Sequence, residues 1–188
     1  MLYNENNINV YKIASKGNGL KPVLESVMFT KDKTVATDSY RLIEMSVPKN
    51  AKASEFPKAM QGCKPFLVRA RGIKDIKLLK NSTMPVVAIK HLDNTRAEFM
   101  TSVGDTITSH NLPRVHDAFP DYEKIFPTEK PLAEVELNGE LLAELLEVMS
   151  KLNVAQRVKI KIYGTGKPVV LEAGNDNQKG RGMIMCMQ

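Results

Sequence analysis

The chain has 188 residues, of which 43% are hydrophobic and 26% charged, a composition typical of a soluble globular protein. No apolar run approaches the roughly 20 residues that a membrane-spanning helix needs, and the first residues lack a signal-peptide pattern, so we expect a cytoplasmic protein. The net charge of +6 favours an anionic partner, and its excess is largest over residues 51–127.

The first predicted segment, residues 8–47, consists of short strands without a helix. Strands are expected at 21–30, 34–38 and 41–47, separated by a turn at 31–33 and by a polar turn at Asp38 and Ser39. Residues 15–20 are too glycine-rich for a good helix. The three prolines of residues 48–65 predict a connecting loop.

The second predicted segment adds a helix to this pattern. A strand at 65–70 leads into a helix over 71–80, whose period places Ile73, Ile76 and Leu79 on one side. Three strands follow at 85–92, 96–102 and 105–112. The proline-rich segment 119–131, FPDYEKIFPTEKP, is then expected to be an extended linker.

The third predicted segment repeats the second. Residues 132–137, LAEVEL, alternate like a half-buried strand, with Glu134 and Glu136 outward and Ala133, Val135 and Leu137 inward. Asn138 can cap a helix, and strands are expected at 157–164, 167–174 and 180–188. The apolar face of this helix comprises Leu141, Leu145, Val148, Met149 and Leu152.

The unit of strand, helix and three strands thus occurs complete twice and once without its helix. This pattern predicts an α+β fold of repeated units, with antiparallel sheets and helices on one face.

Four stretches of the chain resemble the bacterial DNA polymerase sliding clamp, the polymerase III beta subunit: KPVLESVMFT, VATDSYRL, FPDYEKIFP and GRGMIMCMQ. The chain looks most similar to the shorter clamp-like proteins of phages and mobile elements. The resemblance implies a DNA-clamp-like fold in which residues 1–127 correspond to the clamp's middle domain, with a first unit that lacks its helix. Residues 128–188 then correspond to the second half of its last domain.

The resemblance implies a non-enzymatic ring whose outer wall is sheet and whose helices face double-stranded DNA. Such a ring tethers polymerases and other DNA-processing proteins through a short, mostly apolar peptide that enters a cleft between the last two domains. If a ring contains twelve such strand-helix-three-strand units and each chain supplies three, four chains would be needed to close it. By motif position, the expected cleft residues are Leu24, Thr37, Tyr40, Arg41, Leu42, Pro120, Ile125, Met183, Met185 and Met187.

Two departures from the family pattern bear on this cleft. The family usually has Gly-His where this chain has Ser39 and Tyr40, and a proline near the end where this chain has Cys186. These differences should change the peptide preference. A peptide-binding adaptor or decoy that keeps the cleft without forming a ring is the alternative interpretation.

For DNA, the basic side of the helix at 71–80 predicts sequence-independent phosphate contacts. The expected DNA-binding residues are Arg69, Arg71, Lys74, Lys77 and Lys80. The polar face of the later helix carries Glu140, Glu144 and Glu147 instead, which would repel a DNA backbone. Peptide binding is therefore better supported by the sequence than DNA encirclement.

Catalytic and metal chemistry find no support in the sequence. No Ser/His/Asp or Cys/His arrangement is apparent, and GTGK at 164–167 lacks the spacing of a phosphate-binding loop. His91, His110 and His116 lack metal-ligand spacing, and Cys63 and Cys186 are expected to be free thiols. We therefore expect neither an enzyme nor a cofactor or metal site.

Overall fold

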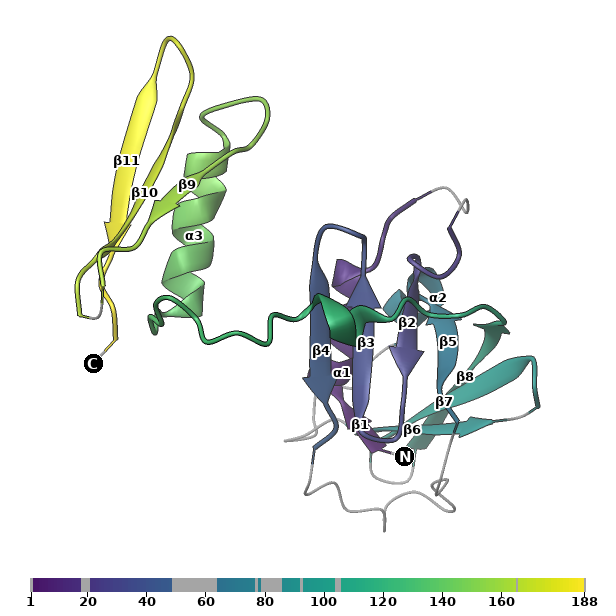
Figure 1. Cartoon of the computed structure of the whole chain (residues 1–188). Coiled ribbons are helices and arrows are strands. Elements are labelled where there is room, and N and C mark those ends of the chain that lie inside the picture. Colours follow the sequence, from purple (N-terminus) through teal and green to yellow (C-terminus); the bar gives the residue numbers. More distant parts are fainter. Residues whose placement is uncertain are drawn as a thin grey trace. The chain divides into compact units, whose positions relative to one another are not determined.

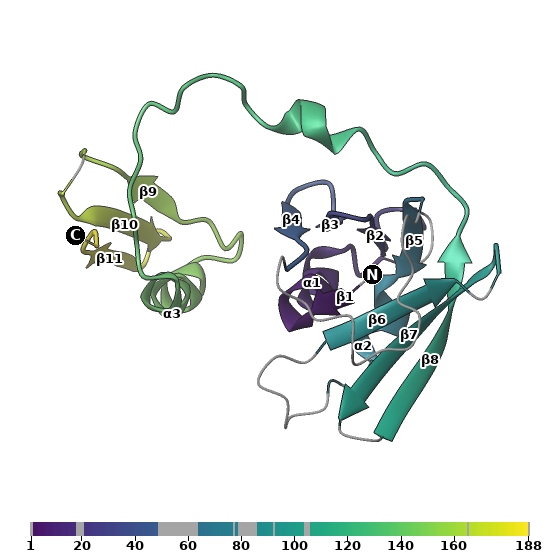
Figure 2. The same ribbon diagram turned by 90° about the horizontal axis from the view of Figure 1, so that it is seen from below.

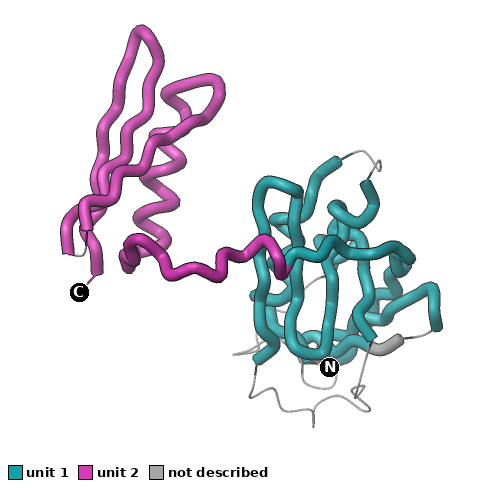
Figure 3. Tube along the Cα trace, in the orientation of Figure 1, with its two compact units in different colours: residues 1–122 teal, residues 123–188 magenta. Residues whose placement is uncertain are grey.

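A computed structural model of the chain describes residues 2–17, 21–48, 64–76, 78, 86–91, 93–103, 106–164 and 166–187. These residues form two compact units, Met1–Tyr122 (unit 1) and Glu123–Gln188 (unit 2), shown in different colours in Figure 3. The boundary between the units falls inside the segment FPDYEKIFP, earlier than the boundary after residue 127 that the sequence suggested.

Unit 1 consists of two motifs of one strand, one helix and three strands, here called βαβββ motifs (Figure 1). The first comprises β1 (Leu2–Asn4), α1 (Glu5–Asn9) with a 3-10 turn η1 (Val10–Ile13), β2 (Ser26–Phe29), β3 (Lys33–Thr37) and β4 (Leu42–Ser46). The second comprises β5 (Phe66–Arg69), α2 (Ala70–Lys74), β6 (Val86–His91), β7 (Arg96–Val103) and β8 (Thr106–Val115).

The two motifs of unit 1 exchange their first strands. All strands join one antiparallel sheet in the order β1-β6-β7-β8-β5-β2-β3-β4. The first strand of each motif pairs with the second strand of the other, with Tyr3 opposite Val87 and Val27 opposite Val68. Strand β5 also pairs with β8, the last strand of its own motif. Neither motif therefore completes its sheet without the other.

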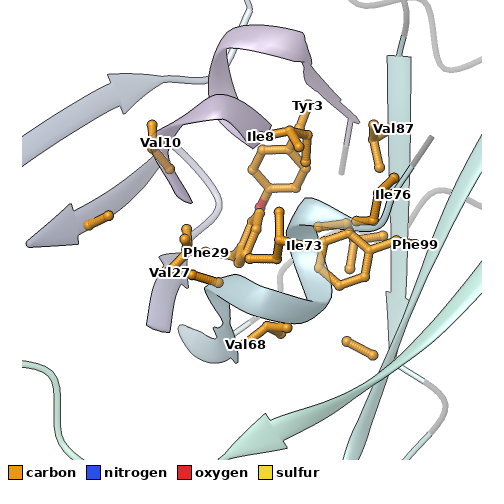
Figure 4. Packing of buried hydrophobic residues seen from close by; sticks show 14 of the residues in the cluster. Tyr3, Ile8, Val10, Val27, Phe29, Val68, Ile73, Ile76, Val87 and Phe99 are labelled. Atoms are coloured by element: carbon orange, nitrogen blue, oxygen red, sulfur yellow. The ribbon is translucent and has the colours of Figure 1, made fainter. Parts of the chain in front are cut away.

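A shared apolar core follows from this exchange (Figure 4). Phe29 of the first motif is fully buried and stacks on Phe66 of the second with ring centroids 5.4 Å apart. Phe99 and Tyr3 each form a T-shaped contact with the Phe29 ring, with ring centroids 5.3 and 5.4 Å apart. Such aromatic contacts add to the gain from burying the rings themselves.

The expectation that the first unit lacks a helix is wrong, because α1 precedes its last three strands. This helix is only five residues long and its sequence, ENNIN, carries no apolar period. It is held by a capping box, in which Asn4 Oδ1 accepts from Asn7 N and Asn7 Oδ1 accepts from Asn4 N. The buried Asn7 amide also donates to the carbonyl oxygens of Met45 and Ser46, at 3.1 and 3.0 Å. The stability of this short helix thus comes from tertiary contacts, because its intrinsic helix propensity is too low.

The second helix is shorter than predicted. α2 ends at Lys74, where Asp75 forms the C-terminal cap, instead of continuing to residue 80. Ile73 and Ile76 are buried as the period predicted, at 0% and 6% exposure, while Leu79 lies outside the described residues. The fold class itself is confirmed as an α+β arrangement of antiparallel sheet with few helices.

Unit 2 is a single motif (Figures 1 and 2). It comprises α3 (Gly139–Ser150) and the antiparallel strands β9 (Lys159–Lys161), β10 (Val169–Gly174) and β11 (Lys179–Ile184), in the order β11-β10-β9. As predicted, Asn138 caps α3 by accepting from Glu140 N and Leu141 N, at 3.0 and 3.1 Å. A Cβ atom added to Gly182 would lie 2.8 Å from Leu145 Cδ1, so glycine lets α3 approach the sheet closely.

The segment Leu132–Leu137 is not a strand, contrary to the prediction. Its alternation is partly retained, because Val135 and Leu137 pack against the core of unit 2 while Glu134 and Glu136 are exposed. The N–H of Met187 donates to the carbonyl oxygen of Glu136 at 2.8 Å. A regular ladder needs a neighbouring strand along the segment, and the described residues of unit 2 provide only this contact near the end of β11.

Candidate peptide-binding and DNA-facing surfaces

A rigid polar corner joins β3 to β4 at residues 37–42. Ser39 takes a positive φ of 79°, which is uncommon for a residue with a side chain and fixes a tight reversal. The buried Thr37 hydroxyl donates to the carbonyl oxygen of Arg41 at 2.7 Å. Asp38 Oδ1 accepts from the backbone N–H groups of Tyr40 and Arg41 at 2.9 and 2.7 Å. The corner thus holds its own backbone in one conformation.

The same carboxylate fixes the Arg41 side chain. Arg41 Nε and Nη2 both donate to Asp38 Oδ2, at 3.0 and 2.8 Å. Burial opposes ionisation of Asp38, but the bonds from the Arg41 guanidinium and from the N–H groups of Arg41 and Tyr40 outweigh it and lower the pKa to about 2. Tyr40, held by this turn, is 96% exposed. The corner therefore presents an aromatic ring and a guanidinium from a fixed base.

We predict that Asp38→Asn removes a contribution to stability that depends on pH. The pKa of Asp38 in the fold, about 2, lies below the ordinary 3.8. The unfolded chain therefore takes up the proton first as the pH falls, and the contribution is lost from about pH 4 down to about pH 2. Urea unfolding should show the gap between wild type and variant narrowing over this window.

The control is Asp32→Asn, which removes an exposed carboxylate whose contact to Lys31 is 3.8 Å long. This control should change the free energy of unfolding little at any pH. A gap between wild type and Asp38→Asn that stays constant through the window would contradict the prediction.

Beside the corner, three distant segments of unit 1 line a hollow of about 470 Å³. It brings together Leu24 and Pro120, both expected in the cleft, with Ser39 of the corner. The position of Pro120 is fixed by its neighbours: Phe119 meets Tyr122 edge-on at 5.9 Å, and the Tyr122 ring is buried with Lys33 over it at 5.2 Å. The FPDY sequence thus anchors the wall of this hollow.

Four of the remaining cleft residues lie in unit 2 and are exposed. Met183, Met185 and Met187 are 63%, 57% and 53% exposed and alternate with Ile184 and Cys186, which pack on the core. Ile125, in the turn η3 (Tyr122–Ile125), is 70% exposed. The residues expected in the cleft are thus divided between the two units, and Leu42 of unit 1 is half-buried.

The basic surface of unit 1 is larger than the sequence suggested. A hollow of about 700 Å³ is lined by Arg69, Arg71 and Lys74, as predicted, and also by Lys12 and Lys16. Arg69 is bound to Glu25 at 2.7 Å, which lowers its value as a phosphate ligand. The predicted residues Lys77 and Lys80 lie outside the described residues.

Lys12 and Lys16 were not expected at this surface, because they lie at and after the turn η1, in a segment where no helix was predicted. Lys16 lies beyond the turn, so no helical spacing links the two lysines, and the sequence offered no signal that both would line this hollow. On α3 of unit 2, Glu140, Glu144 and Glu147 are exposed, and Glu147 forms an ion pair with Lys151 at 2.9 Å.

Two further findings concern the described residues. No three His, Cys, Asp or Glu side chains among them are grouped so that they could hold a metal ion. None of the helices that the structure describes combines the length and apolarity that crossing a bilayer requires. Cys186 is a free thiol, and Cys63 falls outside the described part of the chain.

Solved structures that match this fold include bacterial polymerase III beta chains and an archaeal PCNA. The DNA polymerase III beta chain of Streptococcus pneumoniae matches 100% of this chain with 49% of its own length, at 18% identity and a TM-score of 0.67. The DNA polymerase sliding clamp of Pseudomonas aeruginosa matches 99% with 50% of its length, at 16% identity and a TM-score of 0.67. PCNA of Thermococcus kodakaraensis matches 98% with 72% of its length, at 12% identity and a TM-score of 0.62.

The fold of this chain is therefore the sliding-clamp fold. Within that class, the whole-chain matches to bacterial polymerase III beta chains confirm the resemblance drawn from the sequence motifs. The chain spans about half the length of the bacterial clamp chains that it matches. No family model and no curated protein matches the sequence.

Proposed function

We propose that this protein is a clamp-like processivity factor that tethers a DNA polymerase or another DNA-processing protein to DNA. In this proposal the chain performs no catalysis itself and binds a short apolar peptide of its partner. The main support is the corner at residues 37–42, where Tyr40 is almost fully exposed on a backbone that Asp38 holds rigid.

The physical argument is one of preorganisation. A large apolar ring exposed to water is unfavourable unless it is covered in a complex, and a ring on a fixed turn loses little conformational entropy on binding. Tyr and Arg dominate the energetics of many interfaces, and the flexible methionines of unit 2 suit partners of varied sequence. The peptide is proposed to contact the corner and the hollow of unit 1, and the methionine row of unit 2 is proposed as a further apolar surface for the same partner.

The test is peptide binding by fluorescence anisotropy. The probe is a fluorescein-labelled short peptide rich in leucine and phenylalanine, and the control peptide has serine at those positions. Tyr40→Ala and Met185→Ala are each expected to weaken binding about 10-fold or more, because each removes a large contact side chain. Ile107→Ala, which shortens a 51% exposed side chain on β8, should leave binding unchanged. Equal binding by all three variants would reject the site.

For DNA we infer that the basic hollow of unit 1 contacts phosphates without reading bases. Four of the five cations that line this hollow, Lys12, Lys16, Arg71 and Lys74, are proposed to contact phosphates, since Arg69 is bound to Glu25. A sliding contact requires this type of interaction. The double variant Lys12→Gln/Lys16→Gln should reduce the slope of log K against log salt for duplex DNA by about 2, since each phosphate contact contributes about 0.9. Lys130→Gln/Lys167→Gln, on unit 2, is the matched control and should leave the slope unchanged.

Encirclement of DNA needs a separate measurement. A closed ring should remain on circular DNA and slide off the same DNA once it is linearised. Peptide binding without such retention would favour the alternative, an adaptor or decoy that uses the peptide site alone. The exposed glutamates of α3 are the observation that favours this alternative, because they would repel a DNA backbone.

A further inference from the structure

The described residues of unit 2 form a single motif, whereas each motif of unit 1 pairs with a second motif within its own unit. In unit 1 the outer edge of each second strand is covered, β2 by β5 and β6 by β1. The corresponding strand of unit 2 is β9, which is an edge strand in the sheet that the structure describes. An open edge exposes backbone N–H and C=O groups that can pair with another strand.

Apolar side chains at β9 and on one flank of α3 are exposed, whereas the inward side chains of the second strands in unit 1 are buried. Ile160 and Ile162, in and just after β9, are 51% and 48% exposed, and Leu141 and Val148 on one flank of α3 are 56% and 65% exposed. The inward residues of the second strands in unit 1 are exposed by 3% or less: Val27, Phe29, Val87 and Ile89. Apart from Tyr40 and Ile107, all the large apolar side chains that are exposed in the described residues belong to unit 2.

The segment Leu132–Leu137 has the position of a first strand, because it leads directly into α3 as β5 leads into α2. Its bond from Met187 N to Glu136 O places it beside the end of β11, as β5 lies beside β8. Strand β5 completes its ladder by pairing on its other side with the second strand of the partner motif. Within the described residues of unit 2, no strand pairs with the equivalent side of this segment.

The charges of the two elements are complementary. Glu134 and Glu136 alternate with the inward Val135 and Leu137 and are exposed, and Lys159 and Lys161 flank Ile160 on β9. Lys161 is bound to Glu172 at 2.6 Å, so it is held on the face of the sheet away from α3. Paired edge to edge with apolar residues inward, the two elements would place carboxylates opposite ammonium groups. Such cross-strand pairs stabilise a sheet.

We infer that two copies of this chain associate through unit 2 about a two-fold axis, exchanging strands as the two motifs of unit 1 do. Leu132–Leu137 of each copy pairs with β9 of the other, and the exposed flank of α3 is buried between the copies. The contact is isologous, so each copy gives and receives one strand. This inference rests on the internal arrangement of unit 1 and is independent of the proposed peptide and DNA sites.

The first test is the mass of the full chain in solution, measured by light scattering and sedimentation. The wild-type assembly should contain an even number of chains, so its mass should be two, four or another even number times the 21.0 kDa chain mass. The double variant Leu141→Glu/Val148→Glu should associate at least about 100-fold more weakly, because it places charges in an apolar contact. Both positions are exposed within unit 2, so its helix signal in circular dichroism should persist. Ala143→Glu, exposed on the polar face of the same helix, should leave association unchanged.

The second test is a charge swap between the two elements. Glu134→Lys/Glu136→Lys in one chain and Lys159→Glu in another should each weaken self-association about 10-fold by opposing like charges. An equimolar mixture of the two variants should associate as wild type does, because both strand contacts then pair opposite charges. Restoration on mixing is specific to strand exchange and is not expected from a loss of folding.

A monomeric wild type, an odd-numbered assembly, or the absence of recovery in the mixture would overturn the inference. The Leu141→Glu/Val148→Glu variant should still bind the labelled peptide. Loss of association with retained peptide binding therefore separates this contact from the proposed peptide site. Association that is intact in a protein without peptide binding would instead reject the proposed function and leave the inference standing.

Discussion

Replacing Phe29 with alanine is expected to lower the free energy of unfolding of unit 1 by about 4 kcal/mol, because it removes a fully buried ring from the centre of the core. The ring meets Tyr3, Phe66 and Phe99, so the loss includes three aromatic contacts as well as a cavity. Urea unfolding followed by circular dichroism measures the change.

Tyr40→Ala is the matched control for this prediction, since it removes a ring of similar size that is 96% exposed. Its free energy of unfolding should stay within about 0.5 kcal/mol of wild type. A loss below about 1 kcal/mol for Phe29→Ala would mean that the ring is not the centre of the packing described above.

The second large effect concerns Asn7, whose replacement by alanine should cost about 2–4 kcal/mol. Its side chain is fully buried and donates to the carbonyl oxygens of Met45 and Ser46 and to Thr34 Oγ1. Alanine leaves these acceptors without their donor and also breaks the capping box with Asn4. A buried acceptor that loses its partner bears its desolvation penalty, to which the lost cap adds.

Asn6→Ala, on the exposed side of the same helix, controls for any general effect of helix propensity. Urea unfolding gives the change in stability, and hydrogen exchange should show faster opening of β3 and β4 in Asn7→Ala. If the two variants unfold at the same urea concentration, the amide bridge from α1 to β4 does not hold the first motif together.

Much of the fold could be predicted because long periodic elements carry their own signal. The apolar period of α3 and the cap at Asn138 predicted that helix correctly, and the polar residues at Asp38 and Ser39 predicted the corner. The helix α1 could not be predicted, since its five residues depend on bonds from Asn7 to strands almost forty positions away. The sequence pattern of Leu132–Leu137 is that of a strand, but a strand also needs a neighbour.

The candidate binding surfaces also divide into features that the sequence could predict and features that depend on tertiary contacts. The methionines near the end of the chain were expected at a surface from the resemblance of GRGMIMCMQ to the clamp's last strand, and all three are exposed. The hollow beside Pro120 and the lysines at positions 12 and 16 depend on contacts between segments that are distant in sequence. Residue types and spacing predict which face an element exposes, while only the tertiary structure brings two such faces together.

The exchange of first strands in unit 1 has a consequence for biosynthesis. Strand β1 leaves the ribosome early, but its partner β6 begins only at residue 86, and Leu2 pairs with Ala88. Until that point is translated, Leu2 and Tyr3 have no ladder to join, and the hairpins of the first motif leave apolar surface uncovered. Contacts of such high order slow folding and prolong the aggregation-prone stage of a nascent chain. The first motif of unit 1 therefore cannot complete its fold until the second motif has been translated.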